Sequence, residues 1–241
     1  MKITFVGTGN MGSIKRCNTS VLVDDILFDV GMGTVKQMQR LQIYTKSIKY
    51  IVLSHFHADH LLDIPNFLCG RIIRHELDYL LTIIGPAGTR QKIIDLMNFT
   101  HGDGNPHKYD NPEEHFNLKV VELNDGDMYE NNLFKLTAFE LDHGKCKPIN
   151  GYILEKDDKK IGYATDTTFC DNYYKICEEC DYVISEVNRL DTGDMHIGLE
   201  DFINTIPNYP NAKFYVVHRG DFDTSKYDDS LFPDDGDVVE I

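Results

Sequence analysis

Apolar runs separated by polar turns fill the first third of the chain, and their pattern favours strands followed by helices. Lys2–Gly7 and Ser20–Val30 are rich in β-branched and aromatic residues, with a turn dipeptide at 24–25. Tyr50–Leu53 is an apolar, β-branched run of the kind found in buried strands. Helical patterns follow the strands at Thr34–Leu41 and Leu61–Leu77. This part of the chain therefore predicts a sheet with helices packed on it.

The same alternation continues to the end of the chain. Leu80–Ile84 predicts a strand, and Thr89–Phe99 a helix capped at Thr89. Four short strands separated by turns are expected next, at Phe116–Leu123, Phe134–Leu141, Ile149–Glu155 and Lys160–Ala164. The last expected elements are strands at Asp181–Glu186 and Lys213–Val217, a helix at Leu199–Thr205 and an edge strand at Asp237–Ile241. Strands precede helices in both halves, which predicts an α/β fold with two β layers flanked by helices, in one domain spanning residues 1–241.

The segment between these halves, Thr100–Pro112, is the longest stretch of turn-forming residues. Long loops often cover functional sites, and this one carries His107 and Tyr109 as candidate substrate contacts. The alternative is an ordinary solvated loop with no role in binding.

The densest group of chemically active side chains is Ser54–Leu61, where the run Tyr50–Leu53 ends. On an extended chain His55, His57 and Asp59 point the same way, and His60 joins them from the first turn of the next helix. Burying three imidazoles and a carboxylate without partners is costly, and a divalent cation removes that cost by accepting their lone pairs. The sequence therefore predicts a metal site, with a solvated polar loop as the alternative.

Three later polar residues each follow an apolar strand: His143, Asp166 and His218. Added to the first four, they give seven nitrogen or oxygen donors and no thiolate. That set suits two neighbouring divalent ions that share a carboxylate and a hydroxide, at the separation of about 3.5–4 Å found in two-metal hydrolases. The imidazole content favours zinc, with manganese or iron(II) as alternatives.

The charge and composition of the chain limit the kinds of partner that it is expected to bind. The 241 residues include 24 basic and 39 acidic side chains, for a net charge of −15, which argues against an extended nucleic-acid surface. The first residues form a strand pattern, not a signal peptide, and no apolar run approaches the ~18 residues needed to cross a bilayer. A soluble cytoplasmic protein without membrane contact is expected, and its six cysteines need not form disulfides.

Two short motifs match known binding or redox patterns but are weak evidence for such sites here. Gly7–Gly12 fits the dinucleotide-binding pattern G-x-G-x-x-G, but the residues after it lead into a strand and not a helix. We therefore predict a tight turn beside the site. Cys177–Cys180 fits C-x-x-C without a second cysteine pair or a thioredoxin-like context, so no redox or metal site is predicted there.

The motif H-x-H-x-D-H at 55–60, followed by His143, Asp166 and His218, resembles the metallo-β-lactamase fold. Further motifs are similar to those of its ribonuclease Z-like phosphodiesterase branch: Asn124–Asp127, Lys147–Tyr152, Gly162–Thr167, and Glu186 with His196. The resemblance implies an αββα sandwich and a homodimer. It also implies that His55, His57 and His143 hold one ion, that Asp59, His60 and His218 hold the other, and that Asp166 bridges them.

The chain departs from the tRNA-processing members of that branch in three places. Those enzymes carry a long arm between the ligands that correspond to His143 and Asp166, where this chain has only the 22 residues 144–165. Their His-Glu-Ala-Thr motif is Ser185–Asn188 here, and Arg219–Asp221 replaces their Ser-x-Arg-Tyr. An armless, acidic chain is more similar to small cyclic-nucleotide phosphodiesterases, including phage-encoded anti-Pycsar enzymes. A phage origin would place it in the host cytoplasm.

The expected reaction is therefore metal-hydroxide attack on the phosphorus of a 3′,5′-cyclic mononucleotide, which includes the cyclic pyrimidine signals of anti-phage defence. His196, held by Glu186, is the expected proton donor to the leaving oxygen, and Asp59 the acceptor of the nucleophile's proton. The alternatives are a ribonuclease Z-like tRNA 3′-processing endonuclease, a thioester, lactone or β-lactam hydrolase on the same fold, and a binding protein with a vestigial site. In a homodimer, the Thr100–Pro112 loop is expected to cover the partner's pocket.

Overall fold

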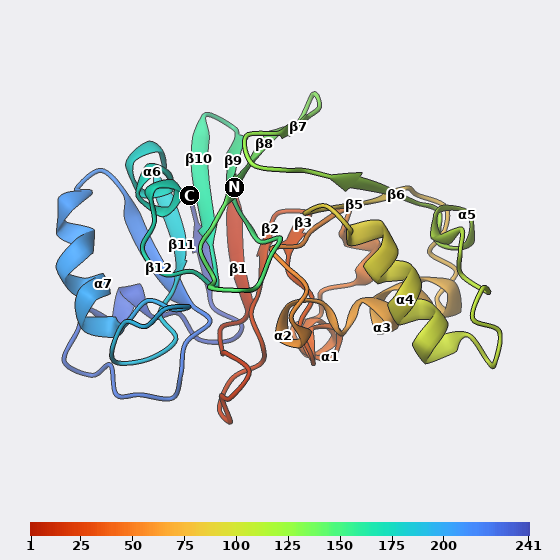
Figure 1. The fold of residues 1–241 in the computed structure, drawn as a ribbon, viewed down its shortest axis with the longest axis horizontal. Helices are drawn as coiled ribbons and strands as arrows, with labels where there is room; N and C mark the ends of the chain where they lie inside the picture. The colour runs from red at the N-terminus through yellow and green to blue at the C-terminus, as the bar shows by residue number, and fades with distance from the viewer.

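The computed structural model describes residues 1–241 and arranges thirteen strands in two mixed sheets (Figure 1). The first sheet has the strand order β13-β1-β2-β3-β4-β5-β6. Its strands are β1 (Lys2–Gly7), β2 (Ser20–Val23), β3 (Ile26–Phe28), β4 (Tyr50–Val52), β5 (Leu81–Gly85), β6 (Leu118–Glu122) and β13 (Val238–Glu240). The second sheet has the order β12-β11-β10-β9-β8-β7. It consists of β7 (Met128–Glu130), β8 (Lys135–Glu140), β9 (Asn150–Lys156), β10 (Lys159–Ala164), β11 (Tyr182–Glu186) and β12 (Lys213–Val217).

Seven α-helices and three 3-10 helices connect the strands. The α-helices are α1 (Thr34–Arg40), α2 (Ala58–Leu61), α3 (Ile64–Ile73), α4 (Thr89–His101), α5 (Pro112–Phe116), α6 (Asp171–Glu179) and α7 (Leu199–Thr205). The 3-10 helices are Thr45–Ser47, Ile206–Asn208 and Asp229–Leu231. None of the helices is long and apolar enough to cross a membrane.

Alternating side chains divide the apolar residues of each strand between two cores. In β1, Ile3 and Phe5 pack between the sheets, whereas Val6 faces the helices on the outer side. In β5, Ile84 lies between the sheets and Ile83 on the helix side. The period of two along a strand produces this division.

Helices cover both outer faces of the pair of sheets. α1, α3 and α4 contribute to the core on the first sheet, and α6 and α7 to the core on the second (Figure 1). The result is the expected αββα sandwich.

Strand directions decide where the functional side chains emerge. β3, β4, β5 and β6 run parallel in the first sheet, and β10, β11 and β12 run parallel in the second. β8 and β10 are both antiparallel to β9, so β8 points the same way as β10. The two sheets are joined near the end of β4, where Tyr152 Oη donates to the Leu53 carbonyl (2.8 Å) and the Asn150 amide to the Ser54 carbonyl (2.9 Å). Residues that follow β4, β8, β10, β11 and β12 therefore meet at one edge of the sandwich.

Several predicted boundaries were wrong. The single helix expected over Leu61–Leu77 is two helices, α2 and α3, because Pro65 has no amide hydrogen and fits only in the first turn of a helix. Gly88, not Thr89, is the N-cap of α4, and the Thr89 hydroxyl instead donates to the Pro86 carbonyl at 2.7 Å. The strand expected from Phe116 begins two residues later, since α5 ends at Phe116.

Other expectations were confirmed. The 22 residues 144–165 contain β9, β10 and the turn between them, and they form no projecting arm. The C-terminal residues form the edge strand β13, which pairs with β1. The elements that were not predicted are α5, α6, β7 and the three 3-10 helices. Cys177 and Cys180 are free thiols in the core under α6, consistent with a packing role.

Candidate metal centre

The first four candidate ligands lie on the short connection between β4 and α3. His55 and His57 belong to the extended segment after β4, and His57 directly precedes α2. Asp59 and His60 lie in α2, so the expectation that Asp59 continues an extended chain was wrong. A helical turn, not strand alternation, brings its carboxylate to the other side chains.

The other three candidates follow strands of the second sheet, as expected. His143 follows β8, Asp166 follows β10 and His218 follows β12. Asp166 (φ 52°) and His218 (φ 49°) both adopt the left-handed backbone conformation, which is uncommon outside glycine. Such backbone geometry concentrates at functional sites, where the surrounding structure holds it in place.

Asp166 lies between two groups of side chains. Its Oδ2 is 3.5 Å from His143 Nε2 and 3.7 Å from His55 Nε2. Its Oδ1 is 3.1 Å from His60 Nε2 and 3.2 Å from His218 Nδ1. One carboxylate oxygen therefore faces each group.

Within each group the donor atoms are close together. His57 Nδ1 lies 3.3 Å from His143 Nε2 in the first group. In the second, His218 Nε2 and His60 Nε2 lie 3.1 Å and 3.7 Å from Asp59 Oδ2. The structure thus separates the seven residues into the two expected sets, with Asp166 between them.

A buried carboxylate that the sequence analysis missed supports this arrangement. Asp29 follows β3, has a positive φ of 55° and is fully buried. Its Oδ2 lies 2.7 Å from His60 Nδ1 and accepts hydrogen bonds from the Ser54 and Tyr163 hydroxyls, both at 2.8 Å. Because Asp29 accepts the Nδ1 hydrogen of His60, Nε2 faces Asp166, and in the neutral ring its lone pair is available to a metal ion. The available signal was its position at a strand end, like that of Asp166.

His143 is oriented in the same way from the opposite side. Its Nδ1 lies 2.8 Å from the Met195 carbonyl oxygen, which can only accept a hydrogen bond. The proton of the neutral ring is therefore on Nδ1, and the lone pair of Nε2 points toward His57. Such hydrogen bonds fix the tautomer and orientation of histidines that bind metals.

Burial and neighbouring charges shift the pKa values of the cluster in opposite directions. Burial, reinforced by His60, holds the pKa of His55 well below its usual value. Burial also opposes ionisation of Asp59, but its hydrogen bond with His218 lowers the pKa of that carboxyl to about 2. For His218 burial acts against the charged form, and the Asp166 carboxylate together with Asp59 outweighs it, raising the pKa to about 9. In the metal-free cluster, burial therefore favours the neutral form of His55. The Asp59 carboxyl is ionised, and His218 is readily protonated.

The residues present fit divalent cations. His55 Nε2, His60 Nε2 and Asp166 Oδ1 are buried and make no hydrogen bond of adequate geometry in the protein, although the last two atoms are 3.1 Å apart. Leaving such atoms unsatisfied is costly, and native proteins rarely do so without a bound ion or water. Imidazole nitrogen and carboxylate oxygen are suitable ligands for zinc, manganese and iron. His/Asp/Cys groups that could bind metal ions are therefore a structural feature of this chain.

The expected proton-donor pair lies beside the cluster. Glu186, the last residue of β11, is fully buried and accepts a hydrogen bond from the Thr167 amide. His196 Nδ1 lies 2.9 Å from Glu186 Oε2 and 3.1 Å from Oε1. The His196 ring is 4.8 Å from the ring of His143, centroid to centroid. The sequence analysis singled out these two residues, and the structure places their side chains within hydrogen-bonding distance.

A cleft of about 290 Å³ lies over His196 and the candidate metal ligands. Asn10, Met11 and Asn188 line it together with His57, Asp59, His143, Asp166, His196 and His218. The turn at Gly7–Gly12 therefore lies beside the site, as expected, and Asn10 is hydrogen-bonded to Arg219, the residue after His218.

The structure does not bring the two loop candidates to this cleft. The Tyr109 ring is buried and stacks on Phe116, at 5.4 Å between centroids, so it belongs to the core under α4 and α5. His107 is exposed and pairs with Asp110 (Nδ1 to Oδ2, 3.0 Å). Both assignments as substrate contacts of their own chain's site are therefore corrected. Coverage of a partner's pocket by the Thr100–Pro112 loop stays a prediction.

Comparison with known proteins agrees with the fold and the donor set. The family model of the beta-lactamase superfamily domain matches residues 24–219. The chain therefore belongs to the metallo-β-lactamase superfamily.

Its curated relatives include ribonucleases. Ribonuclease Z of Picrophilus torridus is 34% identical over 173 residues, which are 66% of this chain and 50% of the relative. Ribonuclease BN of Salmonella heidelberg is 32% identical over 169 residues, 66% of this chain and 51% of the relative. The chain spans about half the length of the curated relatives it matches.

Solved structures share the fold over nearly the whole chain. The short form of human tRNase Z superposes with a TM-score of 0.77 at 22% identity, covering 100% of this chain and 99% of the other. A diphosphatase of the PhnP family gives a TM-score of 0.77 at 18% identity, with 100% and 97% coverage. Zinc-bound PqqB from Methylobacterium extorquens gives 0.76 at 12% identity, with 100% coverage of both chains.

Proposed function

We propose that this protein is a dinuclear, metal-dependent phosphodiesterase that hydrolyses 3′,5′-cyclic mononucleotides. The observation that supports the proposal most strongly is the pair His196 and Glu186, because His196 lines the same cleft as five of the seven candidate metal ligands. Hydrolysis of an alkyl phosphodiester requires both activation of water and protonation of a poor leaving group. The cleft offers residues for both tasks.

Two sets of residues would hold the ions. His55, His57 and His143 form the first, and Asp59, His60 and His218 form the second, with one oxygen of Asp166 facing each. When bound, divalent cations at these positions supply Lewis acidity, which neutralises charge on phosphate oxygens and lowers the pKa of water to near neutrality. The imidazole-rich donor set supports zinc, and manganese or iron(II) would also fit.

His196 is placed to protonate the leaving oxygen. The buried Glu186 carboxylate accepts the hydrogen of its Nδ1, which fixes the orientation of the ring. Nε2, on the other side of the ring, makes no hydrogen bond within the protein and is free to donate a proton to substrate. Asp59 Oδ2 is the nearest carboxylate oxygen to His218, and it is the candidate acceptor for the proton of the attacking water.

The shape and charge of the chain support a small substrate. Residues 144–165 contain a short loop, β9, β10 and the turn between these strands, so no arm at this position could hold a tRNA. A net charge of −15 opposes binding of a polyanion, whereas a cyclic mononucleotide carries a single phosphate charge.

The second candidate is a ribonuclease Z-like nuclease that processes tRNA 3′ ends. It is favoured by the sequence identity of 34% with ribonuclease Z of Picrophilus torridus over two thirds of this chain. A thioester, lactone or β-lactam hydrolase on the same fold is a third candidate, but such a reaction gives the Glu186–His196 pair no evident role.

One experiment separates these candidates. The metal-loaded protein is incubated with purine and pyrimidine 3′,5′-cyclic mononucleotides, with linear diesters, with a 3′-extended tRNA, and with thioester and lactone substrates. We expect turnover of cyclic mononucleotides, loss of that turnover when metal is removed, and no trimming of the tRNA. Cleavage of the tRNA alone would replace the proposal with the second candidate, and hydrolysis of thioesters or lactones alone with the third.

A further inference from the structure

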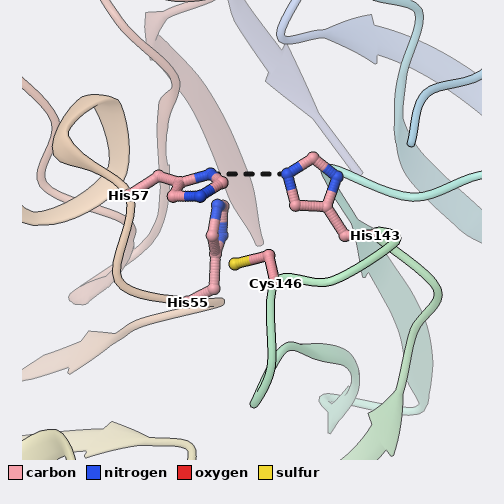
Figure 2. A group of neighbouring side chains, drawn as sticks. All are labelled: His55, His57, His143 and Cys146. Carbon is pink, nitrogen blue, oxygen red and sulfur yellow. Dashed lines mark hydrogen bonds between the residues drawn. The ribbon is translucent and has the colours of Figure 1, made fainter. Parts of the chain in front are cut away.

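The loop between β8 and β9 brings one more donor to the three-histidine group. Cys146 is half-buried, and its Sγ belongs to a set with donor nitrogens of His55, His57 and His143 in which all four atoms lie within 4.8 Å of one another. In Figure 2 its side chain reaches the group from the side opposite the His55–His57 segment, with the sulfur directed toward His55. The expected donor set contained no thiolate, so this residue adds a ligand type that sequence analysis did not assign.

The spacing of two of the three histidines already suits a metal site. His57 Nδ1 and His143 Nε2 are 3.3 Å apart. This equals the edge of a tetrahedron with metal–nitrogen bonds of about 2.0–2.1 Å, which is about 3.3–3.4 Å, and a zinc–sulfur bond of about 2.3 Å lengthens the edge to sulfur only slightly. His55 Nε2 is fully buried and has no hydrogen-bond partner. A cation among these atoms would satisfy that nitrogen and lie within bonding distance of sulfur after small side-chain rotations.

We propose that Cys146 is a ligand of the ion held by His55, His57 and His143. On binding, the S–H bond breaks, the proton passes to solvent, and a sulfur–metal bond replaces a bound water molecule. Asp166 Oδ2 also faces this group, 3.5 Å from His143 Nε2, so Asp166 would remain between the two ions. The inference rests on the metal site of the proposed function.

A thiolate ligand would change which metal this position accepts. Soft sulfur donors favour zinc over manganese, which prefers carboxylate, carbonyl and water oxygens. The second group, Asp59, His60 and His218, has no sulfur and would lack this preference. The protein would therefore have one zinc-selective position and one permissive position.

Cobalt(II) spectroscopy tests the sulfur bond directly. The metal-free protein is titrated with cobalt(II), and the near-ultraviolet absorption is recorded, where thiolate-to-cobalt charge transfer gives an intense band. We expect this band in the unaltered protein and in Cys69→Ser, a similarly half-buried cysteine on α3 outside the cluster. We expect it to be absent in Cys146→Ser and in Cys146→Ala, both of which are first shown to have the circular dichroism spectrum of the unaltered protein.

A second readout is metal affinity without any substrate. Competition with a chelator should show zinc binding at one of two positions weakened at least about tenfold in Cys146→Ser, as expected for loss of a ligand. Manganese binding should change much less. An unchanged charge-transfer band in both Cys146 variants, or zinc and manganese affinities that fall equally, would overturn the inference and leave the proposed function standing. A protein that binds no cobalt at all would overturn both.

Discussion

Asp29 links the cluster of candidate metal ligands to the end of β3. Its buried carboxylate engages His60 Nδ1, the Ser54 hydroxyl and amide, and the Tyr163 hydroxyl. None of its oxygens faces the cleft, so it acts through His60 and not on substrate. It is therefore a positioning residue for the second metal group.

Replacing this carboxylate should weaken metal binding without removing a ligand. We expect Asp29→Asn to lower the affinity for zinc by about 10- to 100-fold, the usual cost of losing the partner of a metal-binding histidine. Chelator competition measures this, and Asp25→Asn, in the turn between β2 and β3, is the matched control. Equal affinities for the two variants would remove Asp29 from this role.

His196 should matter only when the leaving group needs a proton. We expect His196→Ala to slow hydrolysis of a cyclic mononucleotide by about 10²- to 10⁴-fold, the range of general acid catalysis, and to slow an activated aryl phosphodiester much less. The comparison of kcat/KM on both substrates measures the difference. His115→Ala, at an exposed histidine of α5 outside the cleft, should change neither rate. An equal loss on both substrates would assign His196 to binding or structure instead.

The ion pair between Asp59 and His218 predicts how the metal-free protein responds to pH. The pKa of His218 is about 9, because Asp166 and Asp59 outweigh the effect of burial. Since the unfolded value is about 6.5, this stabilisation is complete below pH 6.5 and is lost as the pH rises through 9. We expect the free energy of unfolding to fall by about 1–3 kcal/mol between pH 7 and pH 9.

Urea denaturation of the metal-free protein at several pH values tests this expectation. His218→Asn should remove most of the decline, because its amide does not titrate. Stability that stays constant or rises from pH 7 to pH 9 in the unaltered protein would contradict the assignment.

At the scale of single residues, the sequence predicted candidate metal ligands where the type of side chain by itself indicates metal binding. Three histidines and an aspartate within six residues pointed to metal, and His143, Asp166 and His218 were found because each follows an apolar strand. Asp59 reached the site for a different reason, since α2 and not an extended chain positions it. Cys146 was missed because nothing in its local sequence shows which other loop lies across from it.

The loop after β3 positions α2 through backbone contacts. The Val30 amide donates to the His60 carbonyl (2.8 Å), and the Asp63 amide to the Val30 carbonyl (3.0 Å). Gly31 allows this close approach, because a Cβ at that position would lie 1.9 Å from the Asp59 carbonyl oxygen. The glycine is needed so that the helix carrying Asp59 and His60 can pack against the first sheet.

A methyl group at this position should therefore disturb α2. We expect Gly31→Ala to destabilise the metal-free protein by about 1–3 kcal/mol, as overpacking does, and to lower its thermal midpoint. Gly12→Ala is the control, since its Cβ would meet only Asn10 Oδ1 at 3.7 Å. Equal midpoints for the two variants, measured by circular dichroism, would show that α2 can shift without cost.

The missed helices and strands are either very short or polar overall. α6 is nine residues long and buries Tyr173, Ile176 and Cys177, of which only one is strongly apolar. α5 spans five residues and β7 three, too short for a period to be recognised. The long apolar strands of both sheets were predicted because their side chains are buried on both faces, a pattern that no turn or loop imitates.

The sandwich as a whole explains why residues more than 160 positions apart meet. β4 in one sheet and β8, β10 and β12 in the other end at the same edge, so the loops that follow them share one cleft. The sequence predicted the two layers from the order of strands and helices. It could not show which strands are neighbours, because β13 and β1, at opposite ends of the chain, pair through long-range contacts alone.

The central claim is that two cations lie side by side across Asp166. Crystals of the zinc-loaded protein, measured at the zinc absorption edge, test it by anomalous difference density. We expect two peaks about 3.5–4 Å apart, one among His55, His57 and His143 and one among Asp59, His60 and His218. A single peak, or two peaks that do not both lie next to Asp166, would contradict the account.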